Sequence, residues 1–506
     1  MRLIDLACSP RKLAAAFVII SIFCFVGTLV YQQVLPLPTS FRNVDIQNIR
    51  NSLPYVTYNK PVCEESKSAD IAAETFNSTY THGKGIYANG YETSYVTGAE
   101  DVFLMIKTGA TVLWQRFPIH MVTTLPQLPH FAIYSDAPDM VAGIPVIDIL
   151  AQTTRNLRES PQFDNYRKQQ SLLREHANIE LWDEKAGIEG AWDLDKYKNL
   201  PMVSHAYRTH PTAKWYIFMD ADSYILWPNM MRWLSSINHK DILYMGSVAY
   251  LGDEPFAHGG SGVIMSAGLI TKTFGAEPGL EYEYEEFTKS HCCGDHVLAH
   301  AFLARHIKVL SGESYPHVSW RIQGEPPISV RYNKDNWCKE IVTFHHLTSH
   351  EVEQLYEFER KFPQNQPILY RDVYHEFVMP YIRDERRNNW DNLADSRHYS
   401  KDREEDQSNP KETAYKSYED CSSKCDEWED CVQFRYQPGY CGLSNNIRLG
   451  MKHTQGESSF SSFWRIDRIR GFRKRSGCDH LDDLPEEGEF FRQQSDEANM
   501  KPPPGG

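Results

Sequence analysis

The first feature of the hydrophobic pattern is an uncharged apolar run near the N-terminus. Residues 13–30 read LAAAFVIISIFCFVGTLV, about 18 residues without a charge, which is just long enough to cross roughly 30 Å of hydrocarbon as a helix. Lysine and arginine precede this run, and neither recurs until Arg42. The asymmetry predicts a cytosolic tail (1–12) and one membrane span (13–31). A cleaved signal peptide is the alternative, although its apolar core is normally shorter.

Beyond the predicted span the pattern changes. Residues 32–95 are rich in Pro, Asn, Ser and Thr without sustained periodicity, which predicts a stem. Within residues 96–382, apolar runs such as VFLMIK, HFAIYSD, WYIFMD and GVIMS end in polar turns and alternate with helix-compatible stretches. This alternation predicts a layered α/β domain with a mixed, largely parallel sheet and flanking helices.

The C-terminal part divides into three segments. Residues 383–414 are charged and lack a strong apolar face, so we predict a solvated linker. Residues 415–478 contain a cluster of cysteines that predicts a small separate unit. Residues 479–506 are acidic and end in KPPPGG, which predicts a disordered tail.

Composition narrows the class of protein. The chain has 506 residues, of which 41% are hydrophobic, and a formal net charge of −14. These values are typical of a folded globular protein. Because the acidic balance provides no basic field to attract phosphates, we expect no nucleic-acid partner.

Cysteine usage indicates an oxidising compartment. Nine of the 11 cysteines follow the predicted span, and disulfides persist in lumenal environments. Four of them, spaced C-x3-C-x5-C-x9-C, are able to pair among themselves and to staple a small α+β unit. These four are Cys421, Cys425, Cys431 and Cys441. Cys292 and Cys293 are adjacent, and one of them is a candidate partner of Cys338, but the sequence leaves the pairing open. Asn77 begins an N-glycosylation sequon.

The most informative segment is KWYIFMDADSYILWPN, residues 214–229. A run typical of a buried strand ends in Asp220-Ala221-Asp222, and ligand sites of open α/β sheets lie at the carboxyl ends of strands. Residues i and i+2 of an extended segment point the same way, so both carboxylates are able to face one divalent cation. A cation there would neutralise the charge on a departing diphosphate. Two solvated aspartates at a strand end are the alternative.

Several further motifs follow one another in a fixed order over residues 100–350. They are Lys107-Thr108, Arg116, IYSD ending at Asp136, WYIFMDADSY, NMMRWL (229–234), Gly259-Gly260-Ser261-Gly262, CCGDHVLA (292–299) and Thr343-Phe344-His345-His346. The ordered set resembles the fringe-like inverting β1,3-glycosyltransferases (family 31), and especially the core 1 β1,3-galactosyltransferase group. Two departures are Ala221 within the acidic run and Gly294 before Asp295, where the family often has a second acid.

The resemblance implies a GT-A fold and a metal site. Asp222 would be a metal ligand, and Asp220 would lie against the ribose or the metal. His345 would be a further ligand, with His346 as an adjacent candidate, and the mixed donor set suits Mn²⁺, with Mg²⁺ possible. A hydrogen-bonded structural pair is the alternative for the two histidines.

The resemblance also implies the catalytic and nucleotide-binding residues. Asp295 would be the base that takes the acceptor proton, while an N-cap of the following helix is its alternative structural role. The nucleotide and sugar would contact a set formed by Lys107, Thr108, Arg116, Asp136, Asp220, Gly259 and Gly260. Trp227, Trp233, Trp320 and Trp337 are candidate stacking faces or core residues.

These features together predict a Golgi membrane protein with a single span, a lumenal catalytic domain and type II topology. We expect it to transfer a hexose or N-acetylhexosamine, with galactose favoured, from a UDP-sugar to a glycan or glycoprotein with inversion, in a β1,3 linkage. The cysteine unit resembles an apple/PAN module, a family that binds proteins or carbohydrates. The alternative function is an inactive lumenal carbohydrate-binding or adhesion protein that acts through this module.

Overall fold

The computed structural model describes most of the chain after residue 94. The described residues are 95–177, 179, 191–312, 315–408, 412–453 and 459–478. The predicted cytosolic tail, the span 13–31, Asn77 and the acidic tail 479–506 lie outside them. Among the helices of the described part, none combines the length and apolar character that a membrane crossing requires.

A seven-stranded sheet forms the centre of the α/β domain, with the strand order β3-β4-β2-β1-β5-β10-β7. Its strands are β1 (Val102–Lys107), β2 (Phe131–Ser135), β3 (Asp139–Val141), β4 (Ile144–Asp148), β5 (Trp215–Asp220), β7 (Tyr244–Gly246) and β10 (Val263–Ser266). The four adjacent strands β4, β2, β1 and β5 are parallel. The outer strands β3, β10 and β7 pair antiparallel. The predicted mixed, largely parallel sheet is therefore confirmed.

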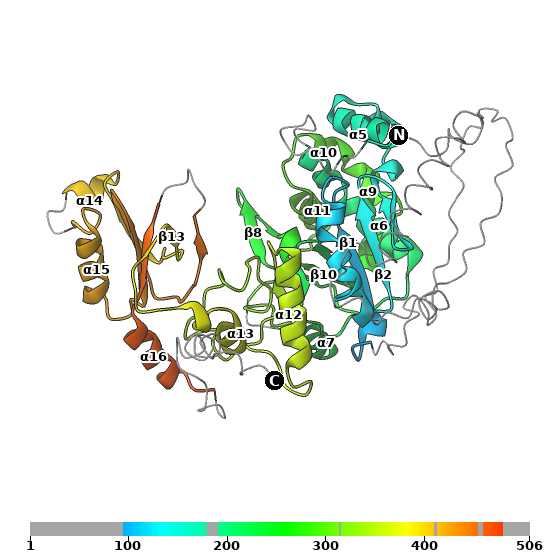
Figure 1. The fold of residues 1–506 in the computed structure, drawn as a ribbon. Coiled ribbons are helices and arrows are strands. Elements are labelled where there is room, and N and C mark those ends of the chain that lie inside the picture. Colours follow the sequence, from blue (N-terminus) through cyan, green and yellow to red (C-terminus); the bar gives the residue numbers. More distant parts are fainter. Residues whose placement is uncertain are drawn as a thin grey trace, which may run out of the picture. The chain divides into compact units, whose positions relative to one another are not determined.

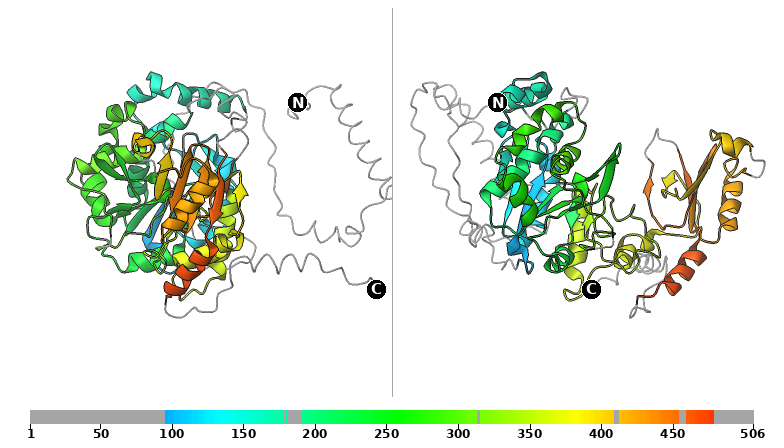
Figure 2. Two further views of the ribbon diagram at one scale, coloured as in Figure 1. Left: turned by 90° about the vertical axis from the view of Figure 1, so that its left-hand side faces the viewer. Right: turned by 180° about the vertical axis from the view of Figure 1, so that it is seen from behind.

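Helices cover both faces of this sheet (Figures 1 and 2). Strands β1 and β5 read as nearly continuous apolar runs because their side chains are buried on both faces. Phe103 and Met105 pack in the core that contains residues of α6 (Asn199–Thr209) and α11 (Gly294–Leu303). Leu104 of the same strand packs in the opposite core, with residues of α7 (Trp227–Ser235).

The remaining elements of this domain are short. The helices are α3 (Leu113–Arg116), α4 (Arg155–Arg158), α5 (Asp164–Arg174), α8 (Ala267–Ile270), α9 (Leu280–Glu283), α10 (Glu285–Lys289), α12 (Ser349–Lys361) and α13 (Tyr370–Phe377). The 3-10 segments include η9 (Ala191–Tyr197) and η10 (Gly259–Ser261). Two antiparallel pairs complete the domain: β6 (Tyr224–Ile225) with β11 (Thr343–Phe344), and β8 (Val248–Leu251) with β9 (Glu254–Ala257).

The C-terminal module is built on a five-stranded antiparallel sheet with the order β12-β18-β15-β16-β14. Its strands are β12 (Arg387–Asn388), β14 (Arg397–Ser400), β15 (Gln433–Gln437), β16 (Tyr440–Ser444) and β18 (Ser461–Trp464), and β13 (Trp390–Asp391) pairs with β17 (Met451–Lys452). Its helices are α14 (Glu404–Ser408), α15 (Tyr418–Glu427) and α16 (Ile466–Arg475). Disulfides Cys421–Cys441 and Cys425–Cys431 confirm that the four clustered cysteines pair internally.

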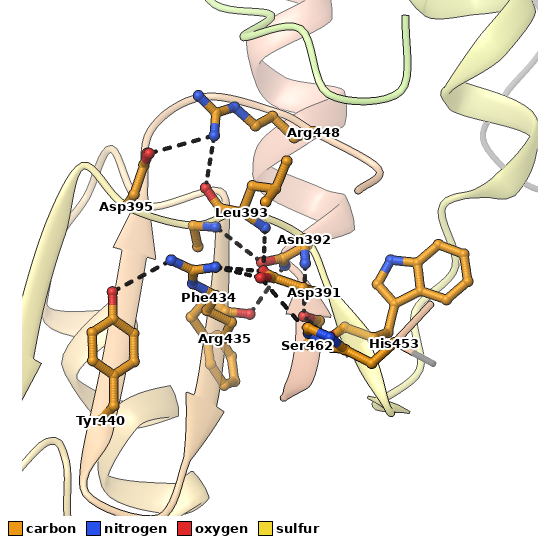
Figure 3. Close-up of polar contacts among 12 residues, drawn as sticks. Asp391, Asn392, Leu393, Asp395, Phe434, Arg435, Tyr440, Arg448, His453 and Ser462 are labelled. Carbon is orange, nitrogen blue, oxygen red and sulfur yellow. Dashed lines mark hydrogen bonds and ion pairs between the residues drawn. The ribbon is translucent and has the colours of Figure 1, made fainter. Parts of the chain in front are cut away.

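The predicted linker 383–414 requires correction, because strands β12, β13 and β14 within it pair with strands of the C-terminal module. Its buried side chains include Asp391 and Asn392. Asp391 accepts two hydrogen bonds of 2.6 Å from Arg435, and Asn392 donates to the carbonyl oxygen of Phe434 (Figure 3). Hydrogen bonds hold this segment together with a few scattered apolar contacts, so its hydrophobic pattern gave no sign of a fold.

A third disulfide links the α/β domain to the end of the module. Cys338 pairs with Cys478, whereas Cys292 and Cys293 pair with each other, so neither adjacent cysteine bridges Cys338. A shared core lies nearby and contains residues of both parts, including Tyr332, Tyr374, Ile447 and Trp464. Tyr332 and Ile447 also form a backbone bridge.

The Cys338–Cys478 disulfide is expected to stabilise the fold more than a local disulfide does. It closes a sequence separation of 140, against six for Cys425–Cys431. In the chain-entropy model, serine at both positions of the long link should lower the free energy of unfolding by about 3 kcal/mol more than serine at both positions of the short one. Urea unfolding of the two double variants measures this difference. Equal midpoints and slopes would contradict the expectation.

Candidate functional site

The candidate site lies where three neighbouring parallel strands end. Lys107 is the last residue of β1, Asp220 is the last residue of β5, and the two are opposite each other in the strand register. Asp136 directly follows β2. Because parallel strands present their carboxyl ends at one edge of the sheet, these three polar residues gather there.

The two aspartates of the Asp220-Ala221-Asp222 segment have different partners. Asp220 Oδ1 lies 3.1 Å from Lys107 Nζ. Asp222 Oδ2 lies 3.1 Å from Arg116 Nη1, and its Oδ1 lies 3.4 Å from His345 Nε2. Burial disfavours the Asp222 carboxylate, but His345 and Arg116 outweigh burial and lower its pKa below the usual value. The segment therefore presents one carboxylate to a lysine and the other to a histidine.

Asp222, His345 and His346 form a group whose ligand atoms all lie within 4.8 Å of one another. Pairing of β11 with β6 brings the histidines to Asp222 from more than 120 positions away in the sequence, since Phe344 lies opposite Tyr224. The amide of Leu347 also donates to the Asp222 carbonyl oxygen, at 2.9 Å. The backbone of His346 is left-handed, with φ of 58°, which turns the chain directly after His345.

The group fits a transition-metal ion. Two ligands about 2.1 Å from one ion lie about 3.4 Å apart at the tetrahedral angle, which matches the separation of Asp222 Oδ1 and His345 Nε2. Within the described residues, Asp222 Oδ1 is buried and receives no hydrogen bond. A carboxylate with imidazoles suits Mn²⁺ or Zn²⁺ better than Mg²⁺, which prefers oxygen ligands.

The glycine turn η10 joins this group to Asp295. The Gly259 amide donates to Asp295 Oδ2 at 2.9 Å, and Ser223 Oγ donates to the Gly260 carbonyl oxygen at 2.6 Å. A Cβ at Gly260 would lie 2.1 Å from the Cε1 of His345. Glycine is needed here because the backbone passes directly against the imidazole.

Alanine at Gly260 should therefore displace His345 and weaken metal binding by about 10- to 100-fold, the range seen when residues behind a metal ligand are changed. Gly324→Ala is the matched control, since a Cβ there meets its nearest atom at an ordinary 3.8 Å. Calorimetric titration of the two variants with Mn²⁺ measures the effect. Equal Mn²⁺ affinities would show that His345 is not a ligand.

Asp295 is fixed at the start of α11 by two backbone donors. Besides Gly259, the His296 amide donates to its Oδ1 at 2.8 Å. The helix begins at Gly294 with Cys293 as its N-cap, so the structural alternative of Asp295 as the N-cap is wrong. The carboxylate is half-buried and its orientation is set by the glycine turn.

Lys107 and Asp136, two of the candidate nucleotide-binding residues, belong to a row of alternating charges that the sequence did not indicate. Lys107 contacts Asp195 as well as Asp220. Lys198 lies 3.3 Å from Asp195 and 3.0 Å from Asp136. Asp195 and Lys198 are separated by three positions, which is the only local signal that predicts their pairing.

Opposite charges favour the ionised forms of Lys107 and Asp195, whereas burial raises the pKa of Asp220 despite its contact with Lys107. Burial disfavours the Lys107 ammonium, but Asp195 and Asp220 raise its pKa. Burial likewise disfavours the Asp195 carboxylate, yet Lys107 and Lys198 lower its pKa to about 2. Thr108 is buried, and its carbonyl oxygen accepts a hydrogen bond of 2.8 Å from Lys198.

His120 is a second residue that the sequence analysis missed. Its Nε2 lies 2.9 Å from the Ala221 carbonyl oxygen and its Nδ1 lies 2.9 Å from Thr124 Oγ1. Burial lowers the His120 pKa to about 4, so the ring is neutral near pH 7 and Nε2 carries the donated proton. The contact fixes the residue between Asp220 and Asp222.

The tryptophan candidates are mostly core residues. Trp227, Trp233 and Trp337 are 0–3% exposed and pack in the hydrophobic clusters, so they offer no stacking face to a sugar. Trp320 is half-buried, and the Lys339 ammonium lies 4.9 Å from its ring centroid.

A buried carboxyl group anchors α12 beneath the site. Glu359 accepts a hydrogen bond from the hydroxyl of Tyr224, which lies two residues after Asp222. Burial raises the Glu359 pKa to about 8, so the folded protein keeps a proton that the unfolded chain loses near pH 4. Stability should therefore fall as pH rises from about 4 to about 8.

Glu359→Gln removes this titration and should flatten that fall. Thermal unfolding between pH 5 and pH 8 tests the expectation, and the variant should gain on the wild type as pH rises. A difference that is constant with pH would contradict the protonated state of Glu359.

No known protein-family model matches the chain, and no curated protein sequence matches it significantly.

Proposed function

We propose that this chain is a metal-assisted inverting glycosyltransferase of GT-A type that uses a UDP-sugar. The observation that carries the proposal is the glycine turn η10, which contacts the candidate base Asp295 on one side and the metal-ligand candidate His345 on the other. A base and a group that holds the leaving diphosphate are the two parts that an inverting transfer requires.

The donor would lie across the carboxyl ends of β1, β2 and β5. A divalent cation held by Asp222, His345 and His346 would act as a Lewis acid that stabilises negative charge on the diphosphate. Arg116 is 45% exposed and ends beside Asp222, so its guanidinium is placed to contact a diphosphate oxygen.

Asp295 would remove the proton of the acceptor hydroxyl. As the acceptor oxygen bonds to the anomeric carbon, the bond from that carbon to the diphosphate oxygen breaks, and the electron pair leaves with UDP. The proton passes to an oxygen of Asp295, whose orientation the amides of Gly259 and His296 hold. Attack opposite the leaving group inverts the anomeric carbon.

UDP release tests this proposal. The purified full chain should release UDP from one of a panel of UDP-sugars, with UDP-galactose favoured, when Mn²⁺ and a glycan acceptor are present. EDTA should abolish the release. Absence of both UDP release and Mn²⁺-dependent UDP binding would contradict the proposal.

A second candidate function is ligand binding by the C-terminal module, which resembles an apple/PAN module. This module has an open surface pocket of about 500 Å³. It is lined by Lys401, Gln407, Tyr415, Lys416, Tyr436, Pro438 and Gly439. Tyrosine rings with amide and ammonium donors suit a saccharide. Glycan-array binding that persists without UDP and without metal, in a protein that releases no UDP, would favour this function.

The sequence also predicts the cellular setting. The predicted span 13–31 and the cysteine usage support a Golgi membrane protein with a lumenal catalytic domain. Fluorescence microscopy of the tagged full chain, with protease protection of the C-terminal tag in sealed vesicles, tests both the compartment and the topology.

A further inference from the structure

Two partly exposed carboxylates at the candidate site have buried lysines behind them. The side chains of Asp195 and Asp220 are 42% and 24% exposed, whereas those of Lys107 and Lys198 are 6% and 2% exposed. The positive groups thus lie in the protein interior, and the carboxylates reach the surface.

The lysines fix the orientation of both carboxylates. The Lys107 ammonium contacts Asp195 Oδ2 and lies 3.1 Å from Asp220 Oδ1. The Lys198 ammonium lies 3.3 Å from Asp195 Oδ1 and donates to the Thr108 carbonyl oxygen. Asp195 Oδ2 and Asp220 Oδ1 contact the same Lys107 ammonium, so the two carboxylates are close neighbours.

This arrangement selects neutral hydrogen-bond donors. An ionised carboxylate only accepts hydrogen bonds and has about four lone-pair sites. The lysines occupy some of these sites, and the remaining ones can accept hydrogen bonds from a ligand. An anion such as phosphate is repelled by both carboxylates, and the Lys107 ammonium already occupies the cation position between them. Two neighbouring hydroxyl groups satisfy both carboxylates without bringing a charge.

We propose that Asp195, together with Asp220, binds a pair of adjacent hydroxyl groups of the donor, and that Lys198 is a positioning residue for Asp195. This inference rests on the proposed use of a UDP-sugar. Such a donor carries two sets of adjacent hydroxyls, one on the ribose and one on the hexose, and they share this chemistry.

Calorimetric titration of the full chain in Mn²⁺ tests the inference with three probes: UDP, 2′-deoxy-UDP and UDP-galactose. Asp195→Asn removes the charge but retains the shape. Asp193→Asn is the matched control, because Asp193 is an exposed carboxylate on the same turn η9. Asp195→Glu is a second variant that keeps the charge for both lysines while it moves the carboxylate, so it guards against a loss of folding.

If the ribose binds there, the wild type should prefer UDP over 2′-deoxy-UDP by about 10-fold or more, as expected for loss of a charge-assisted hydrogen bond. Asp195→Asn and Asp195→Glu should lose this preference, whereas Asp193→Asn should keep it. If the hexose binds there, both Asp195 variants should bind UDP normally and weaken UDP-galactose by about 10-fold.

Equal weakening of all three probes would overturn the inference, because it would show that Asp195 only supports the fold. Affinities within about twofold of wild type for every probe would overturn it as well. Failure of the wild type itself to bind UDP would instead contradict the proposed function, so the two failures are distinguishable.

Discussion

Asp295→Asn is expected to abolish sugar transfer while UDP binding persists. Asparagine has nearly the same shape, but its one carbonyl oxygen accepts only one of the Gly259 and His296 amide hydrogen bonds, and the side chain cannot take a proton from the acceptor. Loss of a general base costs about 10²- to 10⁴-fold in rate. Initial rates of UDP release with saturating acceptor measure the loss, and calorimetry with UDP and Mn²⁺ measures binding.

The separation of rate from binding makes this prediction specific. Asp335→Asn is the control, since Asp335 is exposed and its substitution removes the same charge elsewhere. UDP release at the wild-type rate in Asp295→Asn would show that another group is the base. Loss of UDP binding together with rate would assign Asp295 a structural or donor-binding role.

Asp222→Asn should remove both metal dependence and transfer. The amide is a weaker metal ligand than a carboxylate, and both Arg116 and His345 would lose their negative partner. We expect Mn²⁺ affinity to fall by about 100-fold and UDP release by about 10³-fold. Electron paramagnetic resonance of bound Mn²⁺ and the UDP-release assay measure the two effects.

A contrast with Asp220 sharpens this second prediction. Asp220 is paired with Lys107 rather than with a histidine, so Asp220→Asn should weaken UDP binding more than Mn²⁺ binding. If the two variants lose Mn²⁺ affinity equally, the ion is shared by both carboxylates. If neither loses it, the Asp222, His345 and His346 group is not a metal site.

The sequence alone indicated the central sheet and the position of its polar edge. Apolar runs such as WYIFMD end abruptly in charged residues, and strands of this kind are buried on both faces in a parallel sheet. Lys107, Asp136 and Asp220 could therefore be placed at strand ends. Local pattern is sufficient here because burial of a whole strand leaves an uninterrupted apolar run.

Long-range pairing was decided only by the tertiary structure. Apart from their three-position spacing, nothing local to Asp195 or Lys198 distinguishes them from solvated charges, and their role depends on Lys107 and Asp136, which lie about 60 to 90 positions away. The strands within 383–414 were missed for a related reason: Asp391 and Asn392 are buried through hydrogen bonds, not through apolar faces.

Local pattern and long-range contacts thus determined different features of this protein. The sequence by itself determined the α/β class, the strand ends and the cysteine unit, because periodicity and spacing record burial and local pairing. Only the tertiary structure decided that Cys338 pairs with Cys478, that Gly260 lies against His345 and that Lys107 serves two carboxylates. These contacts join residues far apart in the chain, and their energies depend on distances that no local pattern specifies.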